Sequence, residues 1–157
     1  MYIEPYLFSK VIEHTPLVSI DLIIRNREGQ VLLGQRINKP AQGDWFVPGG
    51  RILKNEFLSE AFKRLTLQEL GKEFAIEQAN LLGHYEHFYN DNFLGEDHVN
   101  THYVVLAYEI QLMDGTPVQL DQQHSDQGWW AIGDLLASEE VHANTKAYFN
   151  EHFCLQA

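Results

Sequence analysis

The residues best suited to chemistry lie between positions 45 and 71. There a Pro-Gly-Gly turn followed by an arginine leads into an amphipathic helix that a glycine ends. At 100° per residue, Glu69 falls on the same helical stripe as Phe62 and Leu65. A carboxylate on an apolar stripe is costly to desolvate, and in the last turn it opposes the helix dipole. Local violations of this kind are typical of functional sites.

A divalent cation between Glu69 and the glycine turn would relieve both costs, because hard cations such as Mg²⁺ prefer carboxylate and carbonyl oxygens. Gly49 and Gly50 would let a backbone carbonyl or amide approach the ion and its phosphate ligands. The alternative is that Glu69, two residues before Gly71, points into water from a frayed helix end. The helix pattern alone leaves both interpretations open.

The elements that must position these residues indicate one α/β domain. A chain of 157 residues that is 45% hydrophobic is long enough for one core and too short for two. Apolar and β-branched runs between turn signals predict strands, and amphipathic stretches predict helices. The expected strands are 17–25, 31–37, 45–47, 81–89, 101–113 and 129–132, and the expected further helices are 5–13, 133–140 and 144–153.

The composition limits the kinds of partner. The formal net charge of −11 argues against nucleic acid, because that binding relies on basic surface. An anionic small molecule is compatible if a metal ion and a few arginines reverse the local field. No apolar run approaches transmembrane length, and residues 1–10 lack the features of a signal peptide. Because Cys154 is the only cysteine, no internal disulfide can form. We therefore expect a cytoplasmic protein with no membrane partner.

Five residues at fixed spacing resemble the Nudix box, the signature of hydrolases that act on nucleoside diphosphates linked to another group. They are Gly50, Glu56, Arg64, Glu69 and Gly71. The resemblance implies an α/β/α sandwich with a mixed β-sheet, formed by residues 1–157 as a single domain. It also implies that Arg64 orients other side chains by pairing with Glu56 or Glu69.

The box departs from the usual Nudix pattern at two positions. Leu65 and Gln68 stand where glutamates are usual, and the loss of two metal-binding carboxylates disfavours the usual multi-metal attack on phosphorus. This departure resembles the GDP-mannose mannosyl hydrolases within the family, whose box also has an Arg-Leu-Thr run before a single glutamate. Other segments with the same resemblance are TPLVS (15–19), PAQGDWFVPGGR (40–51), HFYNDNF (87–93), THYVVL (101–106), Gln-His (123–124) and VHAN (141–144).

The resemblance implies a reaction and the residues that perform it. Gly49, Glu69 and Gln123 would bind one Mg²⁺ per subunit, and His124 would be the general base, since histidine titrates near neutrality. The implied reaction is Mg²⁺-dependent hydrolysis of GDP-mannose, with GDP-glucose as a second substrate, to GDP and the free sugar. Water would attack the anomeric carbon and invert it. The resemblance also implies a homodimer.

Further roles follow from the same resemblance. Arg36 and Arg51 would bind the diphosphate and act in catalysis, since a guanidinium forks onto phosphate oxygens. Two more catalytic residues near the sugar are implied at Asp21 and His87, with Tyr103 as a substrate contact. The N-terminal residues implied to bind the nucleotide are Tyr2, Ile3 and Phe8.

The residues alone leave other interpretations open. Asp21 could cap a neighbour or face solvent, Tyr2 and Phe8 could be packing residues, and the loop 90–97 could be solvated instead of sugar-binding. Two other functions also stay open. A conventional Nudix pyrophosphohydrolase would cleave between the phosphates of a nucleotide sugar, although it needs more carboxylates than this box supplies. A sensor domain would bind a nucleotide sugar without hydrolysing it, and this alternative gives no role to His124 and Gln123.

Overall fold

Strand β1 (Leu17–Arg25) is the centre of the sheet, because it pairs with three other strands. Strand β6 (Thr101–Gln111) runs parallel to it along the whole of one edge. The other edge is shared by two antiparallel partners, β2 (Val31–Arg36) and β4 (Gly49–Arg51). Two separate strands thus share one edge of β1.

The computed structural model describes residues 2–113, 116 and 124–150. The sheet has seven strands, of which five follow the order β3-β2-β1-β6-β5, while β4 pairs with β1 and β7 with β2. The remaining elements are α1 (Pro5–His14), β3 (Trp45–Phe46), α2 (Leu58–Leu70), η1 (Ile76–Gln78), β5 (Asn80–Tyr89), β7 (His124–Trp130), α3 (Ile132–Ala137), α4 (Ala143–Lys146) and η2 (Ala147–Phe149).

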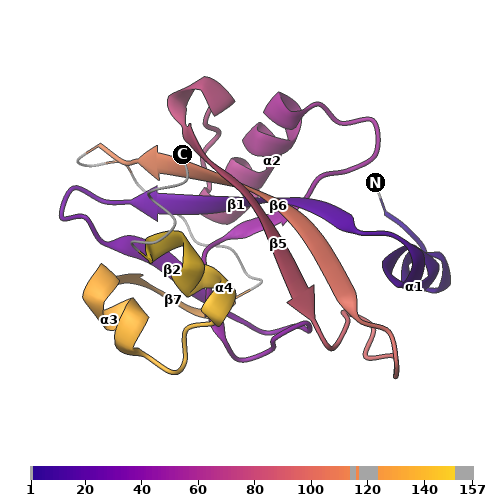
Figure 1. The fold of residues 1–157 in the computed structure, drawn as a ribbon. Coiled ribbons are helices and arrows are strands. Elements are labelled where there is room, and N and C mark those ends of the chain that lie inside the picture. The colour runs from indigo at the N-terminus through magenta and orange to yellow at the C-terminus, as the bar shows by residue number, and fades with distance from the viewer. Residues whose placement is uncertain (1, 114–115, 117–123, 151–157) are drawn as a thin grey trace.

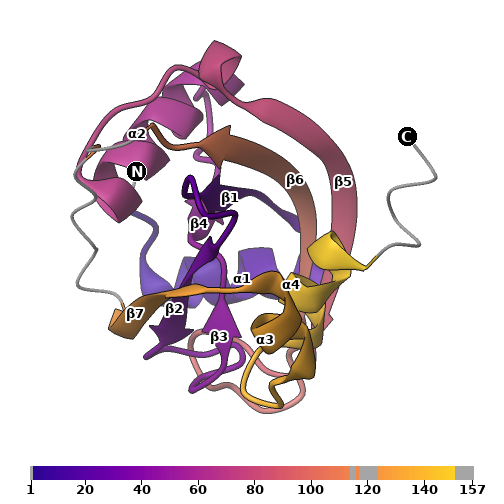
Figure 2. The same ribbon diagram turned by 90° about the vertical axis from the view of Figure 1, so that its left-hand side faces the viewer.

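Alternation along β1 divides the core into two layers. Leu22 and Ile24 belong to the cluster under α2, whereas Ile23 belongs to the cluster under α3 and the C-terminal helical turns. Side chains of a strand point alternately to its two faces, so the sheet separates the layers. Figures 1 and 2 show α2 on one side of the sheet and α3 and α4 on the other. The predicted sandwich with a mixed sheet is therefore confirmed.

Most element boundaries lie within two residues of the sequence predictions. The exceptions are the strand 129–132, the helices 133–140 and 144–153, and the predicted turn at 48–50, whose two glycines belong to strand β4. Strand β7 begins at His124 and ends at Trp130, so the predicted strand 129–132 starts too late. Residues 124–128 have mostly polar side chains and no clear period, so their sequence does not predict a strand. Pairing with β2 makes them one. The predicted helix 144–153 is also too long, since α4 ends at Lys146 and continues only as the 3₁₀ turn η2.

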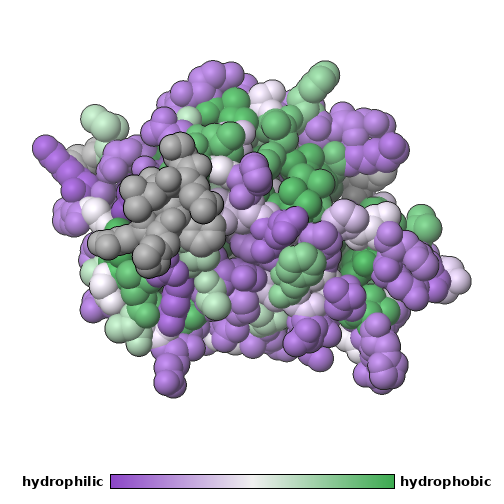
Figure 3. Space-filling model, viewed as in Figure 1, coloured by the Kyte–Doolittle hydropathy of each residue, from purple (hydrophilic) through white to green (hydrophobic). Residues whose placement is uncertain are grey.

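The surface exposes both hydrophilic and apolar side chains. The face drawn in Figure 3 is largely hydrophilic, with separate apolar patches. Exposed apolar side chains include Phe57, Leu81 and Phe88. Within the described ranges, no helix has both the length and the hydropathy needed to cross a bilayer.

Candidate active site

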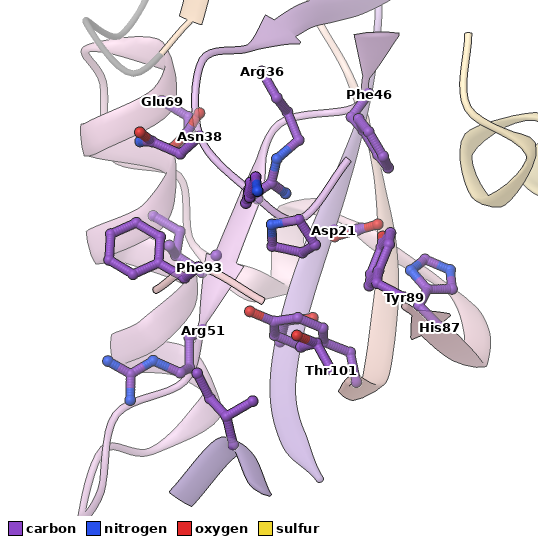
Figure 4. A pocket seen from close by; sticks show the side chains of 18 of the residues that line it. Asp21, Arg36, Asn38, Phe46, Arg51, Glu69, His87, Tyr89, Phe93 and Thr101 are labelled. Atoms are coloured by element: carbon purple, nitrogen blue, oxygen red, sulfur yellow. The ribbon is translucent and has the colours of Figure 1, made fainter. Parts of the chain in front are cut away.

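A pocket of about 520 Å³ lies where α1, β4, α2, β5 and β6 meet. The close-up in Figure 4 shows polar and aromatic side chains from several elements pointing into it. Apart from Gln123 and His124, whose side chains are not among the described parts of the chain, every residue that the sequence singled out for the site lines this pocket. The lining residues from that set are Tyr2, Ile3, Phe8, Asp21, Arg36, Gly49, Arg51, Glu69, His87 and Tyr103.

Strand β4 approaches β1 so closely at Gly49 that no side chain fits. A Cβ on Gly49 would lie 2.4 Å from the Ile20 carbonyl oxygen. The hydrogen bond from the Leu22 amide to the Pro48 carbonyl, 2.8 Å long, fixes the register of the antiparallel pair. Because hydrogen-bonded and non-hydrogen-bonded pairs alternate, Gly49 and Asp21 form a non-hydrogen-bonded pair. The Gly49 carbonyl is thus directed away from β1 and is available to a ligand.

Helix α2 places its last carboxylate inside the molecule. Glu69 is 2% exposed and lines the pocket, as its position on the apolar stripe predicts. The helix ends at Gly71, whose φ of 72° suits glycine. Helix α2 is seated on β4 so closely that a Cβ on Gly50 would meet the Leu65 side chain at 2.5 Å. Leu65 and Gln68, which stand in place of the usual glutamates, also line the pocket.

Arg64 joins the loop before α2 to strand β4. Its Nε donates to Glu56 Oε1 at 2.7 Å and its Nη2 to Glu56 Oε2 at 3.0 Å. Glu56 precedes the helix, so the pair spans eight residues without a helical bend. Nη2 also donates to the Arg51 carbonyl at 2.9 Å. The hydrogen bond from Arg64 holds the pKa of Glu56 below its usual range. Arg64 therefore orients Glu56 and the end of strand β4, and its pairing with Glu56 agrees with the sequence prediction.

The two arginines at the pocket are supported by aromatic rings. The Arg36 guanidinium lies 5.5 Å from the centre of the Phe46 ring, and that of Arg51 lies 4.6 Å from the centre of the Phe8 ring. Burial raises the pKa of Tyr103, while the positive charges of both arginines act in the opposite direction. Arg36 and Arg51 are therefore near the same tyrosine, and together they make this part of an acidic protein suitable for an anion.

Asp21 and His87 form the floor of the pocket beside β1 and β5, and Tyr148 joins them from behind. The Tyr148 hydroxyl donates to Asp21 Oδ2 at 2.5 Å and lies 3.4 Å from His87 Nε2. Burial raises the pKa of Asp21 to about 6, and the Tyr148 hydrogen bond and the Arg36 charge limit the rise. Burial, with a smaller effect of His142, lowers the pKa of His87 to about 4. His87 is therefore neutral at pH 7.

Sequence reasoning missed the polar role of Tyr148. Tyr148 falls within the expected helix 144–153, and its ring is buried, with 6% exposure and membership of the second core cluster. Its hydroxyl nevertheless reaches Asp21, 127 positions earlier in the chain. No local pattern carries that information, because the contact depends on where η2 is packed against the sheet. Only the presence of an unexplained aspartate in β1 signalled that a partner was needed.

The loop between β5 and β6 is an ordered part of the pocket wall. Its organising residue is Asn92, which is 1% exposed and whose Nδ2 donates to the carbonyls of Glu96 and Val99 at 2.7 and 2.8 Å. Phe93 lines the pocket, and its ring centre lies 6.4 Å from that of Phe8 in α1. The buried Asn92 side chain therefore organises the loop from within, while Phe93, Gly95, Glu96 and Asp97 are exposed.

Glu69 and Gly49 supply only some of the oxygen ligands that one hard cation needs. The Glu69 carboxylate and the Gly49 carbonyl line the same pocket and are oxygen donors of the kind that Mg²⁺ prefers. Within the described ranges, no group of three or more His, Cys, Asp or Glu side chains could hold a metal ion. The third donor expected from the sequence, Gln123, lies outside the described residues. The donors present are compatible with an ion that takes its other ligands from phosphate and water.

His124 is placed on the strand that borders the pocket-lining end of β2. Its Cα is paired with that of Arg36 across the antiparallel β2 and β7 ladder. A register shift between Gly34 and Arg36 interrupts the ladder just before this pair. The side chain of His124 is not among the described parts of the chain, so its role as base stays a prediction.

A pocket lined by arginines beside the glycines of strand β4 suits a phosphorylated small molecule. The family model described as NUDIX domain matches residues 15–153. The chain therefore belongs to the Nudix family of hydrolases, whose members generally use a divalent metal ion such as Mg²⁺.

Relatives with names or structures agree with this assignment. The chain is 46% identical over 115 residues, 73% of its own length and 70% of the other, to the low-salt glycan biosynthesis protein Agl8 of Haloferax volcanii. It is also similar to a MutT NUDIX hydrolase of Burkholderia pseudomallei, with 27% identity, a TM-score of 0.66 and coverage of 86% of this chain and 96% of that one.

One further similar structure was determined with a ligand. The NUDIX domain of Shewanella oneidensis NrtR, complexed with ADP ribose, has 22% identity and a TM-score of 0.63, and the match covers 96% of this chain and 93% of that chain. At this identity the similarity shows the fold. It also shows that a domain of this fold binds a nucleotide joined to a sugar.

Proposed function

We propose that this protein hydrolyses GDP-mannose, with GDP-glucose as a second substrate, to GDP and the free sugar. The observation that carries the proposal is the composition of the pocket around Glu69. Leu65 and Gln68 line the pocket at the two positions where a glutamate would extend a metal cluster. One buried carboxylate suits a single cation bound to a diphosphate leaving group better than a multi-metal attack on phosphorus.

The diphosphate is the group that the arginines bind. Arg36 and Arg51 lie on aromatic rings. Their side chains therefore lose less conformational entropy when the guanidinium groups bind phosphate oxygens. One Mg²⁺ per subunit, bound by Glu69, Gly49 and Gln123, would supply additional positive charge to the leaving group. This arrangement lowers the need for a general acid, because the diphosphate leaves as an anion already paired with cations.

Bond cleavage takes place at the sugar carbon. The oxygen of water forms a bond to the anomeric carbon, and the bond from that carbon to the bridging oxygen breaks with its electron pair going to the diphosphate. His124 takes the proton from water as general base. Attack from the side opposite the leaving group inverts the anomeric configuration.

The sugar and the nucleoside occupy the two ends of the pocket in this proposal. Asp21, His87 and Tyr103 contact the sugar or the bridging oxygen. The residues that contact the nucleoside come from the N-terminal segment and are Tyr2, Ile3 and Phe8. Their common presence in the pocket lining supports both assignments, and the name of the Haloferax volcanii relative supports a role in glycan metabolism.

Hydrolysis in ¹⁸O-labelled water tests the proposal. The purified protein is incubated with GDP-mannose and Mg²⁺, and the position of the label is determined by mass spectrometry. Label in mannose, with GDP as the other product, is expected. Label in a phosphate would mean that the protein is a conventional pyrophosphohydrolase. Tight binding without either product would mean a nucleotide-sugar-binding domain.

The assembly and compartment belong to the same proposal. We propose a cytoplasmic homodimer that binds a small-molecule nucleotide sugar and neither nucleic acid nor membrane. The exposed apolar side chains of the edge strand β5, Leu81 and Phe88, are candidates for the contact between subunits. Light scattering during gel filtration should give twice the chain mass of 18.2 kDa, and a monomer mass would exclude the dimer.

A further inference from the structure

Tyr148 does not line the pocket, but its hydroxyl lies between two side chains that do. It is 6% exposed and comes from the 3₁₀ turn η2 behind the sheet. On one side the hydroxyl donates to Asp21 Oδ2 at 2.5 Å, and on the other it is within hydrogen-bond reach of His87 Nε2 at 3.4 Å. Because this buried hydroxyl joins Asp21 of β1 to His87 of β5, it controls whether each of them donates or accepts a hydrogen bond.

The number of hydrogens on the Tyr148 hydroxyl determines which atom donates in its contacts with Asp21 and His87. A tyrosine hydroxyl has one hydrogen, and here it is directed to the Asp21 carboxylate. The contact with His87 can then be a hydrogen bond only if Nε2 carries a hydrogen and donates it to the tyrosine oxygen. His87 is neutral at pH 7 because burial lowers its pKa to about 4. Its single ring hydrogen is therefore on Nε2, and Nδ1 is an acceptor.

We propose that Tyr148 is a specificity-determining positioning residue that sets the hydrogen-bonding polarity of the pocket floor, so that Asp21 and His87 both act as acceptors toward hydroxyl groups of the substrate. The assignment of those hydroxyls to a sugar rests on the proposed function. The polarity itself does not, since it follows from the geometry of the three side chains.

The surroundings hold this arrangement in place. The second oxygen of Asp21, Oδ1, lies next to Gly49, where a Cβ would come within 2.9 Å of it. The Tyr148 ring is packed edge-on against Tyr85, with ring centres 4.7 Å apart. With Tyr148 fixed in this way, neither acceptor can rotate without losing a buried hydrogen bond. A floor built only of acceptors favours ligands that present hydroxyl hydrogens and disfavours analogues that lack them, because the acceptors would then be buried unpaired.

The first test needs no substrate. Long-range ¹H–¹⁵N spectra of protein labelled at histidine distinguish the two neutral tautomers, and the His87 signals are those lost in His87→Gln. The wild-type protein at pH 7 should show His87 with hydrogen on Nε2. In Tyr148→Phe, the signals should move toward the other tautomer or a mixture. Hydrogen on Nδ1 in the wild type would overturn the proposal even if Tyr148→Phe fails to fold.

A matched control separates the hydroxyl from general packing. Tyr108 is also a buried tyrosine, with 8% exposure, but it belongs to the core cluster on the other face of the sheet, against Phe62. Tyr108→Phe removes the same atom away from the floor and should leave the His87 spectrum unchanged. An equal change in both variants would mean that His87 responds to packing in general, and the assignment to Tyr148 would be lost.

The second test uses the proposed reaction. Tyr148→Phe should raise the KM for GDP-mannose about tenfold, the effect of losing a buried hydrogen bond to a charged group. The inhibition constant of GDP, which lacks the mannose, should change by less than about twofold, because GDP makes no contact with the Asp21 and His87 acceptors in this proposal. Equal changes for both ligands would overturn the proposal. Absence of GDP-mannose hydrolysis in the wild type would refute the proposed function instead, and the tautomer experiment would still decide the role of Tyr148.

Discussion

Replacing Gly49 by alanine tests how closely β4 must approach β1 for the pocket to form. The new Cβ would lie 2.4 Å from the Ile20 carbonyl oxygen and 2.9 Å from Asp21 Oδ1, whereas ordinary van der Waals contact begins at 3.4 Å. The closer of these atoms belongs to the backbone of the central strand, which β6 holds from the other edge. The strand β4 therefore has to move away from β1 by about 1 Å.

The size of the effect follows from the bonds on either side. The Leu22 amide to Pro48 carbonyl bond and the Ile52 amide to Val18 carbonyl bond are both 2.8 Å long, and a displacement of about 1 Å exceeds the range of a hydrogen bond. Loss of two such bonds at about 1 kcal/mol each, with residual steric strain, predicts that Gly49→Ala lowers the free energy of unfolding by about 2–4 kcal/mol.

Urea unfolding monitored by tryptophan fluorescence measures this change, with Gly50→Ala as the matched control. A Cβ at Gly50 meets the end of the Leu65 side chain at 2.5 Å. A side-chain end can rotate where a backbone carbonyl cannot, so the control should cost about 1 kcal/mol. Combination with Leu65→Val should recover much of that loss. If Gly49→Ala stays within about 0.5 kcal/mol of the wild type, the inferred close approach of the strands is wrong.

Three further changes have defined outcomes. Because burial raises the pKa of Asp21 from 3.8 to about 6, the folded protein binds this proton more tightly than the unfolded chain, and stability from this group is lost as pH rises from 4 to 6. The stability of Asp21→Asn relative to wild type should therefore increase by up to about 3 kcal/mol between pH 4 and pH 7 in paired urea titrations, and a pH-independent difference would contradict that pKa. Glu69→Gln should sharply reduce Mg²⁺-dependent turnover of GDP-mannose, and His124→Gln should reduce it about a hundredfold or more; near-normal turnover in His124→Gln would remove the base assignment. Asn92→Ala removes the buried amide that bridges two carbonyls of the β5–β6 loop and should destabilise the protein by about 2–3 kcal/mol, whereas the exposed Asn90→Ala should change stability by less than about 0.5 kcal/mol; equal thermal shifts for the two would refute the role of Asn92.

The parts of the site that sequence predicts are those that local chemistry determines. The helical period places Glu69 on the apolar stripe, and its 2% exposure agrees. The two glycines before Arg51 are predicted to bring backbone close to an ion, and the contacts show that they also let β4 approach β1 at Gly49 and Leu65 of α2 at Gly50. In each case the signal lies within a few residues, so a rule of spacing or conformation is enough to find it.

The parts that sequence could not predict depend on contacts between distant segments. The bond from Tyr148 to Asp21 is decided by how η2 is packed behind the sheet. Strand β7 begins five residues earlier than expected, at His124, because its partner β2 is already in place and supplies the pairing that its own sequence does not encode. Tertiary context of this kind commonly overrides weak strand propensity.

The parallel pairing of β1 with β6 has a consequence for the order in which the chain can fold. Leu17 is paired with Tyr103 and Arg25 with Gln111, so the partners are 86 positions apart along the whole central ladder. During synthesis β1 must wait, with one edge open, until β6 has left the ribosome. Contacts of this separation close large loops and slow folding. A hydrophobic strand that waits for a distant partner is also the segment most exposed to wrong pairing in a growing chain.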